Sequence, residues 1–236
     1  MKIHVGTSGF AFKEWKGLFY PEKIPNHEML RFYSERLGAV EINYTFYHMP
    51  TEKLLASWSA QVPEDFSFAF KAPRVITHIK RLRDVDNETD YFFRTLAVLG
   101  QKMGAVLFQF PKSFRVDLPL LENFLELIPL DVRCAFEFRS PSWLVPEIFD
   151  LLRKRKFCLC TPDVDGEPPA EIIATAPWGY LRLRRSDYTE ADLEQWLEKV
   201  LARKWRRAFV FFKHEEGGVG AEFATRFHEL AAAHAK

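Results

Sequence analysis

The sequence is poor in cysteine and has no long apolar run. Its three cysteines, Cys134, Cys158 and Cys160, lie in apolar strand-like segments and have neither metal-site nor redox spacing. We therefore expect buried free thiols. No apolar stretch approaches the length of a signal peptide or a membrane span, so the expectation is a soluble cytoplasmic protein with no membrane partner.

An excess of charge of either sign is also missing. The 33 Lys and Arg residues nearly balance the 32 Asp and Glu residues, and the formal net charge is +1. No overall field would hold such a protein on a nucleic acid or an anionic membrane, so any binding of an anion has to be local. The sequence also contains no glycine-rich phosphate loop, no GxSxG nucleophile elbow and no HExxH metal motif.

Apolar and aromatic residues are abundant. Hydrophobic residues make up 47% of the 236 positions and 23 of them are Phe, which is ample material for a large core. No Pro- or Gly-rich linker and no internal repeat divides the chain. We therefore expect one globular domain over residues 1–236.

Short β-rich runs recur along the chain, and each is followed by a segment with helical apolar periodicity. The expected strands are Ile3–Gly6, Ala39–Phe46, Phe66–Ala72, Ala105–Phe110, Arg133–Phe138, Phe157–Thr161, Tyr180–Arg184 and Ala208–Lys213. Caps at Thr51, Asp117 and Thr189 mark the starts of three of the expected helices. Eight such units in about 250 residues are typical of the (β/α)8 barrel. The sequence therefore predicts an α/β fold, a single-domain (β/α)8 TIM barrel.

Polar residues share one face of several expected strands. Because alternate residues of a barrel strand point inward and outward, this parity predicts which side chains line the interior. Enzymes of this fold keep their active sites at the C-terminal ends of the strands, so we expect a charged pocket there. Its expected members include Glu41, Asn43 and Thr45, Lys71, Gln109, Glu137 and Arg139, Asp163, and Arg182 and Arg184.

An ordered set of short segments runs from Gly6 to Trp143. They are Gly6-Thr-Ser-Gly9, Trp15-Lys-Gly17, Phe19-Tyr-Pro21, Val40-Glu-Ile-Asn43, Thr45-Phe-Tyr47, Phe70-Lys-Ala-Pro73, Ile76-Thr-His78, Val106-Leu-Phe-Gln109, Phe136-Glu-Phe-Arg139 and Pro141-Ser-Trp143. This set resembles the YecE-like family of uncharacterised barrel proteins, a domain of unknown function. The resemblance implies a barrel and supplies no reaction. It thins in the C-terminal third, where family members often carry an Asn-Asn-Asp run and this chain has Lys213-His214-Glu215.

Two carboxylates suggest a catalytic pair. Glu41 and Glu137 lie on the second and fifth expected strands and should face each other across the mouth, as acid and base or as acid and nucleophile, with Lys71 as an electrostatic stabiliser. The expected ligand-binding residues are Asn43, Tyr47, His78, Gln109, Arg139, Trp143, Asp163 and Arg182. The other interpretation is a structural ion network, in which Glu41 pairs with Lys71 and Glu137 with Arg139 or Arg182.

The cations in this predicted pocket outnumber the acids, which favours a small anionic or polyhydroxylated ligand and hydrolase or lyase chemistry. The sequence requires no cofactor. A divalent metal site is an open alternative, and it would need several of His4, His78, Glu137, Asp163 and His214 to converge. The alternative function is a non-catalytic or metal-dependent nucleic-acid-binding barrel, for which scattered basic stretches are weak support. The oligomeric state stays open.

Overall fold

The computed structural model describes residues 1–168, 171–213 and 216–234. Its strands form one parallel sheet in the order β6-β5-β4-β3-β2-β1-β9-β8-β7. The strands are β1 Lys2–Thr7, β2 Ala39–Ile42, β3 Ser67–Lys71, β4 Met103–Phe110, β5 Cys134–Phe138, β6 Cys158–Leu159, β7 Thr161–Asp163, β8 Trp178–Leu183 and β9 Arg207–Phe212.

The two ends of this sheet, β6 and β7, are successive pieces of one extended run. Only Cys160 separates them, and its N–H donates to the Phe136 carbonyl on β5 at 2.9 Å. The sheet is therefore a nearly closed barrel with eight strand positions, one of which is split. This arrangement confirms the predicted (β/α)8 barrel, and it divides the expected strand Phe157–Thr161 into two.

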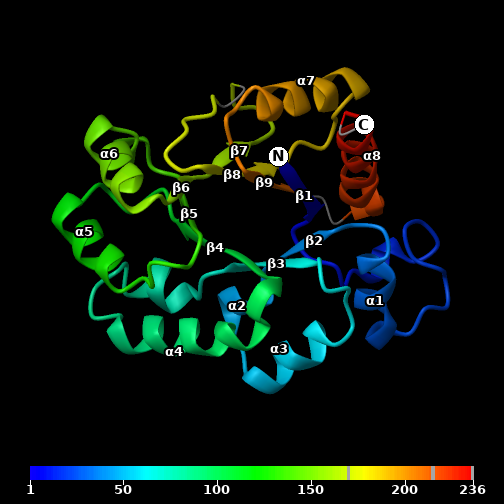
Figure 1. The fold of residues 1–236 in the computed structure, drawn as a ribbon, viewed down its shortest axis with the longest axis horizontal. Helices are drawn as coiled ribbons and strands as arrows, with labels where there is room; N and C mark the ends of the chain where they lie inside the picture. The colour runs from blue at the N-terminus through cyan, green and yellow to red at the C-terminus, as the bar shows by residue number, and fades with distance from the viewer. Residues whose placement is uncertain (169–170, 214–215, 235–236) are drawn as a thin grey trace.

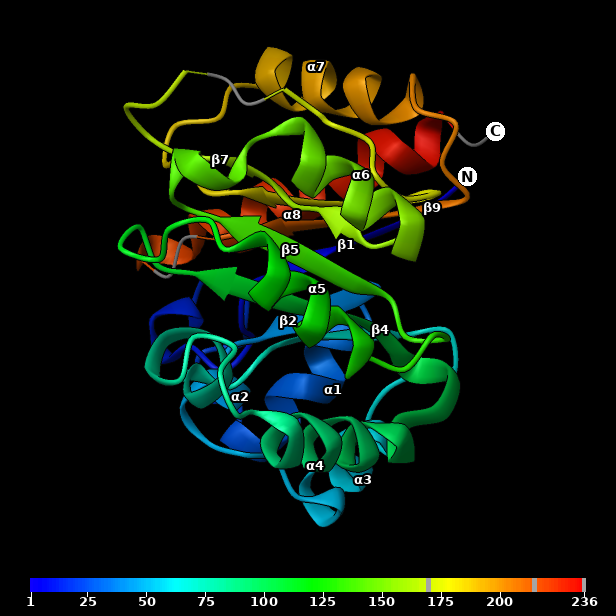
Figure 2. The same cartoon turned by 90° about the vertical axis from the view of Figure 1, so that its left-hand side faces the viewer.

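Helices surround the strands (Figures 1 and 2). They are α1 Met29–Ser34, α2 Tyr44–Tyr47, α3 Glu52–Ser59, α4 Asp86–Leu96, α5 Leu118–Glu126, α6 Pro146–Arg155, α7 Glu190–Leu201 and α8 Val219–Ala233. The three predicted caps are confirmed, because Thr51, Asp117 and Thr189 each accept a backbone N–H at the start of α3, α5 and α7. Among the described residues, no helix is long and apolar enough to cross a membrane.

The core has two layers, one on each side of the sheet. Phenylalanines on the outward faces of the strands pack against one another and beneath the helices, as in the stacked pairs Phe68–Phe70 and Phe110–Phe138. The barrel interior combines alanines on β2 to β5 with aromatic side chains such as Phe209 on β9. Each fully buried Phe stabilises the fold by about 1.5–3 kcal/mol, so these two layers supply most of the driving force for folding.

Strands β1 and β2 approach closely at Gly6. A Cβ atom at this position would lie 1.9 Å from the Ala39 carbonyl oxygen. The Tyr33 hydroxyl on α1 donates to the same oxygen at 2.8 Å and accepts the Thr7 N–H at 2.8 Å. Only glycine allows this contact, which sets the spacing between β1, directly followed by Ser8, and β2, which carries Glu41.

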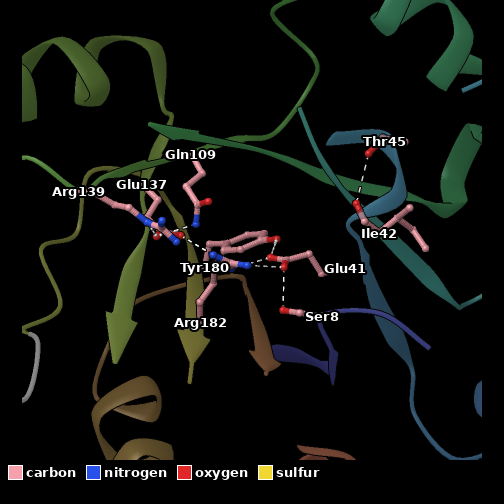
Figure 3. A network of polar contacts seen from close by, with 9 residues as sticks. All are labelled: Ser8, Glu41, Ile42, Thr45, Gln109, Glu137, Arg139, Tyr180 and Arg182. Carbon is pink, nitrogen blue, oxygen red and sulfur yellow. Dashed lines mark hydrogen bonds and ion pairs between the residues drawn. The ribbon is translucent and has the colours of Figure 1, made fainter. Parts of the chain in front are cut away.

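The second strand is shorter than predicted. It ends at Ile42 rather than Phe46, and the next residues form the single turn α2. Thr45 explains the turn, because its hydroxyl lies 3.2 Å from the Ile42 carbonyl (Figure 3) and 2.6 Å from the Lys71 carbonyl at the end of β3. Residues Tyr44–Tyr47 therefore fold over the barrel mouth, and Thr45 does not continue the inward face of the strand.

Candidate functional site

A buried ion triad crosses the barrel at the C-terminal ends of its strands. Arg182 on β8 lies between Glu41 on β2 and Glu137 on β5 (Figure 3). Its Nε and Nη2 donate to the two oxygens of Glu41 at 2.9 and 2.8 Å, and its Nη1 donates to Glu137 Oε2 at 2.7 Å. All three side chains are at most 3% exposed, so one guanidinium lies between two carboxylates away from water, and the triad by itself keeps one negative charge.

Three neutral donors and Arg139 complete the coordination of both carboxylates. Ser8 Oγ and the Tyr180 hydroxyl each donate to Glu41 at 2.7 Å. Gln109 Nε2 donates to Glu137 Oε1 at 2.8 Å, and Arg139 Nε approaches the same oxygen at 3.3 Å. Buried carboxylates are stable only when their oxygens are hydrogen-bonded in this way.

These contacts keep both carboxylates ionised. Burial by itself would raise the pKa of Glu137, but the positive charge of Arg182 and the hydrogen bond from Gln109 outweigh it and lower that pKa to about 2. The pKa of Glu41 is lowered from its ordinary value by the same balance, in which burial opposes the charge and hydrogen bonds of Arg182. At neutral pH neither group holds a proton to donate, which favours the structural network over the acid–base pair.

A cavity of about 700 Å³ opens above the triad. Its cationic lining comes from strand ends on both sides of the barrel, and among the described residues no Asp or Glu side chain lines it. These cations are Lys71, Arg139, Arg182, Arg184 and Lys213. The cavity therefore gathers positive charge in a protein whose net charge is +1.

Aromatic side chains line the same cavity and form what we call its aromatic wall. They come from the segment after β1, from α2 and from α3, and are Phe10, Phe12, Tyr44, Phe46, Tyr47 and Trp58. Phe10 and Tyr44 each meet the Trp58 ring edge-on, with centroids 6.3 and 6.2 Å away. The cavity thus offers apolar ring surface as well as positive charge.

Lys71 and His78 respond to this concentration of cations. Burial, followed by the charge of Arg182, lowers the pKa of Lys71 to about 8. Burial, followed by the charges of Lys71 and Arg139, lowers the pKa of His78 to about 4. The cavity therefore disfavours any further positive charge and holds His78 as a neutral imidazole at pH 7.

The backbone next to His78 is irregular. Val75–Ile79 form one turn of π-helix, and Arg81, Leu82 and Asp84 adopt left-handed conformations with φ of 47°, 69° and 49°. Such conformations cost free energy in residues other than glycine and concentrate at functional sites. The segment after β3 therefore combines backbone strain with a position on the cavity wall.

Comparisons with known proteins place the chain in a family. Residues 4–236 match the model of the family described as "Protein of unknown function DUF72". The chain belongs to the DUF72 family. This match confirms the YecE-like resemblance and extends it through the C-terminal third, where the sequence motifs thin.

Two relatives carry the same designation, UPF0759. The DUF72 chain is 31% identical to the UPF0759 protein YecE of Escherichia coli strain K12 over 142 residues, which is 60% of this chain and 50% of that protein. The match therefore spans about half the length of YecE. The UPF0759 protein YunF of Bacillus subtilis strain 168 is 28% identical, with 97% of this chain and 94% of that protein covered.

Solved structures share the fold. A DUF72 family protein from Thermotoga maritima superposes with a TM-score of 0.87 at 29% identity, over 98% of this chain and all of the other. A second, from Enterococcus faecalis, has a TM-score of 0.80 at 21% identity, over 98% and 95% of the two chains. Both support the barrel.

Most of the predicted site residues of this DUF72 chain come together at the mouth. The carboxylates Glu41 and Glu137 lie in the buried triad beneath the cavity. Those that line the cavity are Asn43, Tyr47, Lys71, His78, Gln109, Arg139 and Arg182. The structural interpretation expected Lys71 to pair with Glu41. It does not, because Arg182, Ser8 and Tyr180 occupy that carboxylate.

Two predicted ligand-binding residues lie elsewhere. Trp143 is fully buried, its Nε1 donates to the Phe114 carbonyl at 2.7 Å, and its ring stacks on Phe138. Asp163 points outward from β7 and accepts hydrogen bonds from Tyr188 and Trp196 at 2.7 and 3.1 Å. Neither side chain lines the cavity, and both bind neighbouring parts of the fold.

Several contributors to the site were missed from the sequence. Tyr180 has the same strand parity as Arg182, so alternation along β8 was the signal that could have found it. Phe10, Phe12 and Trp58 lie on a loop and a helix, where no period-2 pattern points to the mouth. In the described segments no group of three or more His, Cys, Asp or Glu side chains converges to hold a metal, and His214 lies outside those segments.

Proposed function

We propose that this DUF72 chain binds a small organic anion in the cavity at the barrel mouth. One observation carries the proposal: five cationic side chains line the cavity, and no carboxylate of the described residues does. Guanidinium groups bind carboxylates and phosphates through paired N–H donors, and a cavity that excludes part of the solvent strengthens such contacts. The triad supports this role because it holds Arg182 rigidly below the cavity.

The aromatic wall suggests the rest of the ligand. A cavity of about 700 Å³ is within the range that accommodates small molecules of metabolite size. Phe10, Tyr44 and Trp58 present apolar ring surface to it. We therefore expect a ligand that joins an anionic group to a ring, sugar or other partly apolar body. Hydrolase or lyase chemistry on that ligand stays a prediction.

A thermal-shift comparison of charged and uncharged partners tests the proposal. The probes are glucose 6-phosphate against glucose, and adenosine monophosphate against adenosine. A ligand at about 100 times its Kd stabilises the folded state by about 2.7 kcal/mol, so the phosphate that fits should raise Tm by several degrees while its neutral partner does not.

Matched variants locate the binding. Lys71→Ala should reduce the shift, whereas Lys154→Ala, an exposed lysine on α6, should leave it unchanged. Trp58→Ala should weaken the adenosine monophosphate shift more than the glucose 6-phosphate shift. Equal stabilisation by charged and neutral partners would overturn the proposal. Stabilisation by an oligonucleotide and by no small anion would overturn it in favour of a nucleic-acid-binding barrel.

A further inference from the structure

Lys71 holds its ammonium group at the cavity, and no carboxylate of the described residues contacts it. It is the last residue of β3, it lines the cavity, and its Nζ lies 4.0 Å from the centre of the Phe46 ring. Within the described part of the chain, Nζ has no hydrogen-bond or ion-pair partner. A partly buried amine in this situation is available to a ligand.

The groups around Glu41 and Glu137 explain why neither carboxylate pairs with Lys71. Glu41 accepts two hydrogen bonds from Arg182, one from Ser8 and one from Tyr180. Glu137 is occupied in the same way by Arg182, Gln109 and Arg139. A second cation therefore finds both carboxylates already coordinated.

The position of the amine is set by the backbone on both sides. The Thr45 hydroxyl donates to the Lys71 carbonyl at 2.6 Å, which fixes α2 against the end of β3. The contact places Phe46 beside the amine and the ring of His78 edge-on to Phe46, with centroids 4.9 Å apart. The amine therefore lies between an apolar ring and the open cavity.

We propose that Lys71 forms an imine with the carbonyl group of an anionic aldehyde or ketone bound in this cavity. The inference rests on the proposed function and narrows its substrate class to carbonyl compounds that carry a phosphate or a carboxylate. The anionic group of the ligand would lie against the arginines that line the cavity, with its carbonyl carbon within reach of Lys71 Nζ. Amines in cationic, partly desolvated pockets act in this way because their neutral form is favoured.

The reaction balances without a redox partner. The lone pair of the neutral amine attacks the carbonyl carbon and forms a carbinolamine. One amine proton moves to the carbonyl oxygen and forms the carbinolamine hydroxyl. That hydroxyl then leaves with the second amine proton as one water, and the C=O bond is replaced by C=N. Neither carbon nor nitrogen changes its oxidation state overall, so no oxidant or reductant is required.

The charges that face Lys71 favour its neutral form. Burial, then Arg182, lowers the pKa of this amine to about 8, while Glu41 and Glu137 oppose that change and Arg139 adds to it. With a pKa of about 8, roughly a tenth of the amine is neutral at pH 7, against less than about 0.1% of an ordinary lysine. His78 is neutral above pH 5 and adds no charge to this balance.

Pyridoxal 5′-phosphate is a suitable probe because it joins an aldehyde to an aromatic ring and a phosphate. The protein is incubated with it, reduced with borohydride, digested and mapped by mass spectrometry. We expect one preferred adduct, on Lys71. The initial rate of its formation should rise as the pH passes about 8, where the amine loses its proton. Lys71→Arg should lose the adduct entirely, and Lys154→Arg should keep it.

Pyridoxine 5′-phosphate, which lacks the aldehyde, separates the two proposals. It should raise the Tm of wild type and of Lys71→Arg and should suppress the Lys71 adduct. If it stabilises both proteins but pyridoxal 5′-phosphate gives no preferred adduct on Lys71, the imine is overturned and anion binding stands. If it stabilises neither protein and does not suppress labelling of Lys71, the anion site is overturned. If it stabilises neither protein and the labelling is spread over exposed lysines, both proposals are overturned.

Discussion

Replacing Arg182 with methionine removes the cation from the centre of the buried triad while keeping an apolar stem of similar length. Glu41 would lose two charge-assisted hydrogen bonds and Glu137 one. Glu41 would then be buried with only the neutral donors Ser8 and Tyr180 in contact, and Glu137 would keep only Gln109 and the half-buried Arg139 at 3.3 Å. The variant should be strongly destabilised at neutral pH.

The expected loss of stability is that of removing one partner from a buried ion pair. Such changes cost about 3–5 kcal/mol, since they leave an uncompensated charge in a poorly solvated site. For a chain of this size each kcal/mol lowers Tm by about 2–4 °C, so the melting point should fall by roughly 6–20 °C. The cost should shrink toward pH 5, because burial without Arg182 raises the pKa values of the two carboxyls and lets them take up protons.

Urea unfolding at pH 7.5 and pH 5, followed by circular dichroism, measures this cost. Arg94→Met is the control, because Arg94 and Asp90 form an exposed pair on α4 at 3.0 Å and such pairs contribute little. Adding Glu41→Gln and Glu137→Gln to the Arg182→Met variant should recover much of the loss by removing the unpaired charges. The reasoning fails if Arg182→Met costs no more than Arg94→Met, or if the neutral triple variant is no more stable than the single one.

Three further predictions concern protonation. Because the pKa of Glu137 is about 2 against an ordinary 4.5, its ionised form adds stability above pH 4.5 that is lost as the pH falls toward 2, and Glu137→Gln should flatten this part of an acid-unfolding curve. Burial lowers the pKa of His4 from 6.5 to about 4, so the unfolded chain binds a proton across this range that the folded chain does not, and stability falls as the pH falls. His4→Phe should remove the His4 part of this pH dependence from the free energy of urea unfolding between pH 6.5 and 4, while His78 keeps a similar contribution. If the free energy of unfolding depends on pH as steeply as in wild type, the burial of His4 is contradicted. Burial raises the pKa values of all three cysteines, so Ellman's reagent should titrate them only after denaturation, and rapid reaction of the native protein would show that they are accessible.

Strand alternation predicted much of the candidate site. Lys71, Glu137 and Arg182 were expected on inward faces, and the structure places them there because the side chains of a strand alternate whatever its neighbours are. The same rule applied to β7 would have turned Asp163 outward, since Cys158 and Cys160 face the interior. The strand break at Cys160 does not change that parity.

Other features depended on contacts that no local pattern contains. The end of β2 at Ile42 follows from the hydroxyl of Thr45, which meets a carbonyl 26 residues away on β3. The aromatic wall depends on a loop and a helix that meet over the mouth, as the contact between Phe10 and Trp58 shows. Neither segment has a periodicity that marks it as part of a cavity.

The sequence by itself determined the succession of strands and helices, their caps and the inward direction of the polar side chains, because these depend on residues close together in the chain. Only the tertiary structure decided which charges pair. Arg182 binds Glu41 across 141 positions and Glu137 across 45, and this choice leaves Lys71 at the cavity without either carboxylate. The energy of a buried charge depends on every group around it, and those groups meet only when the barrel closes.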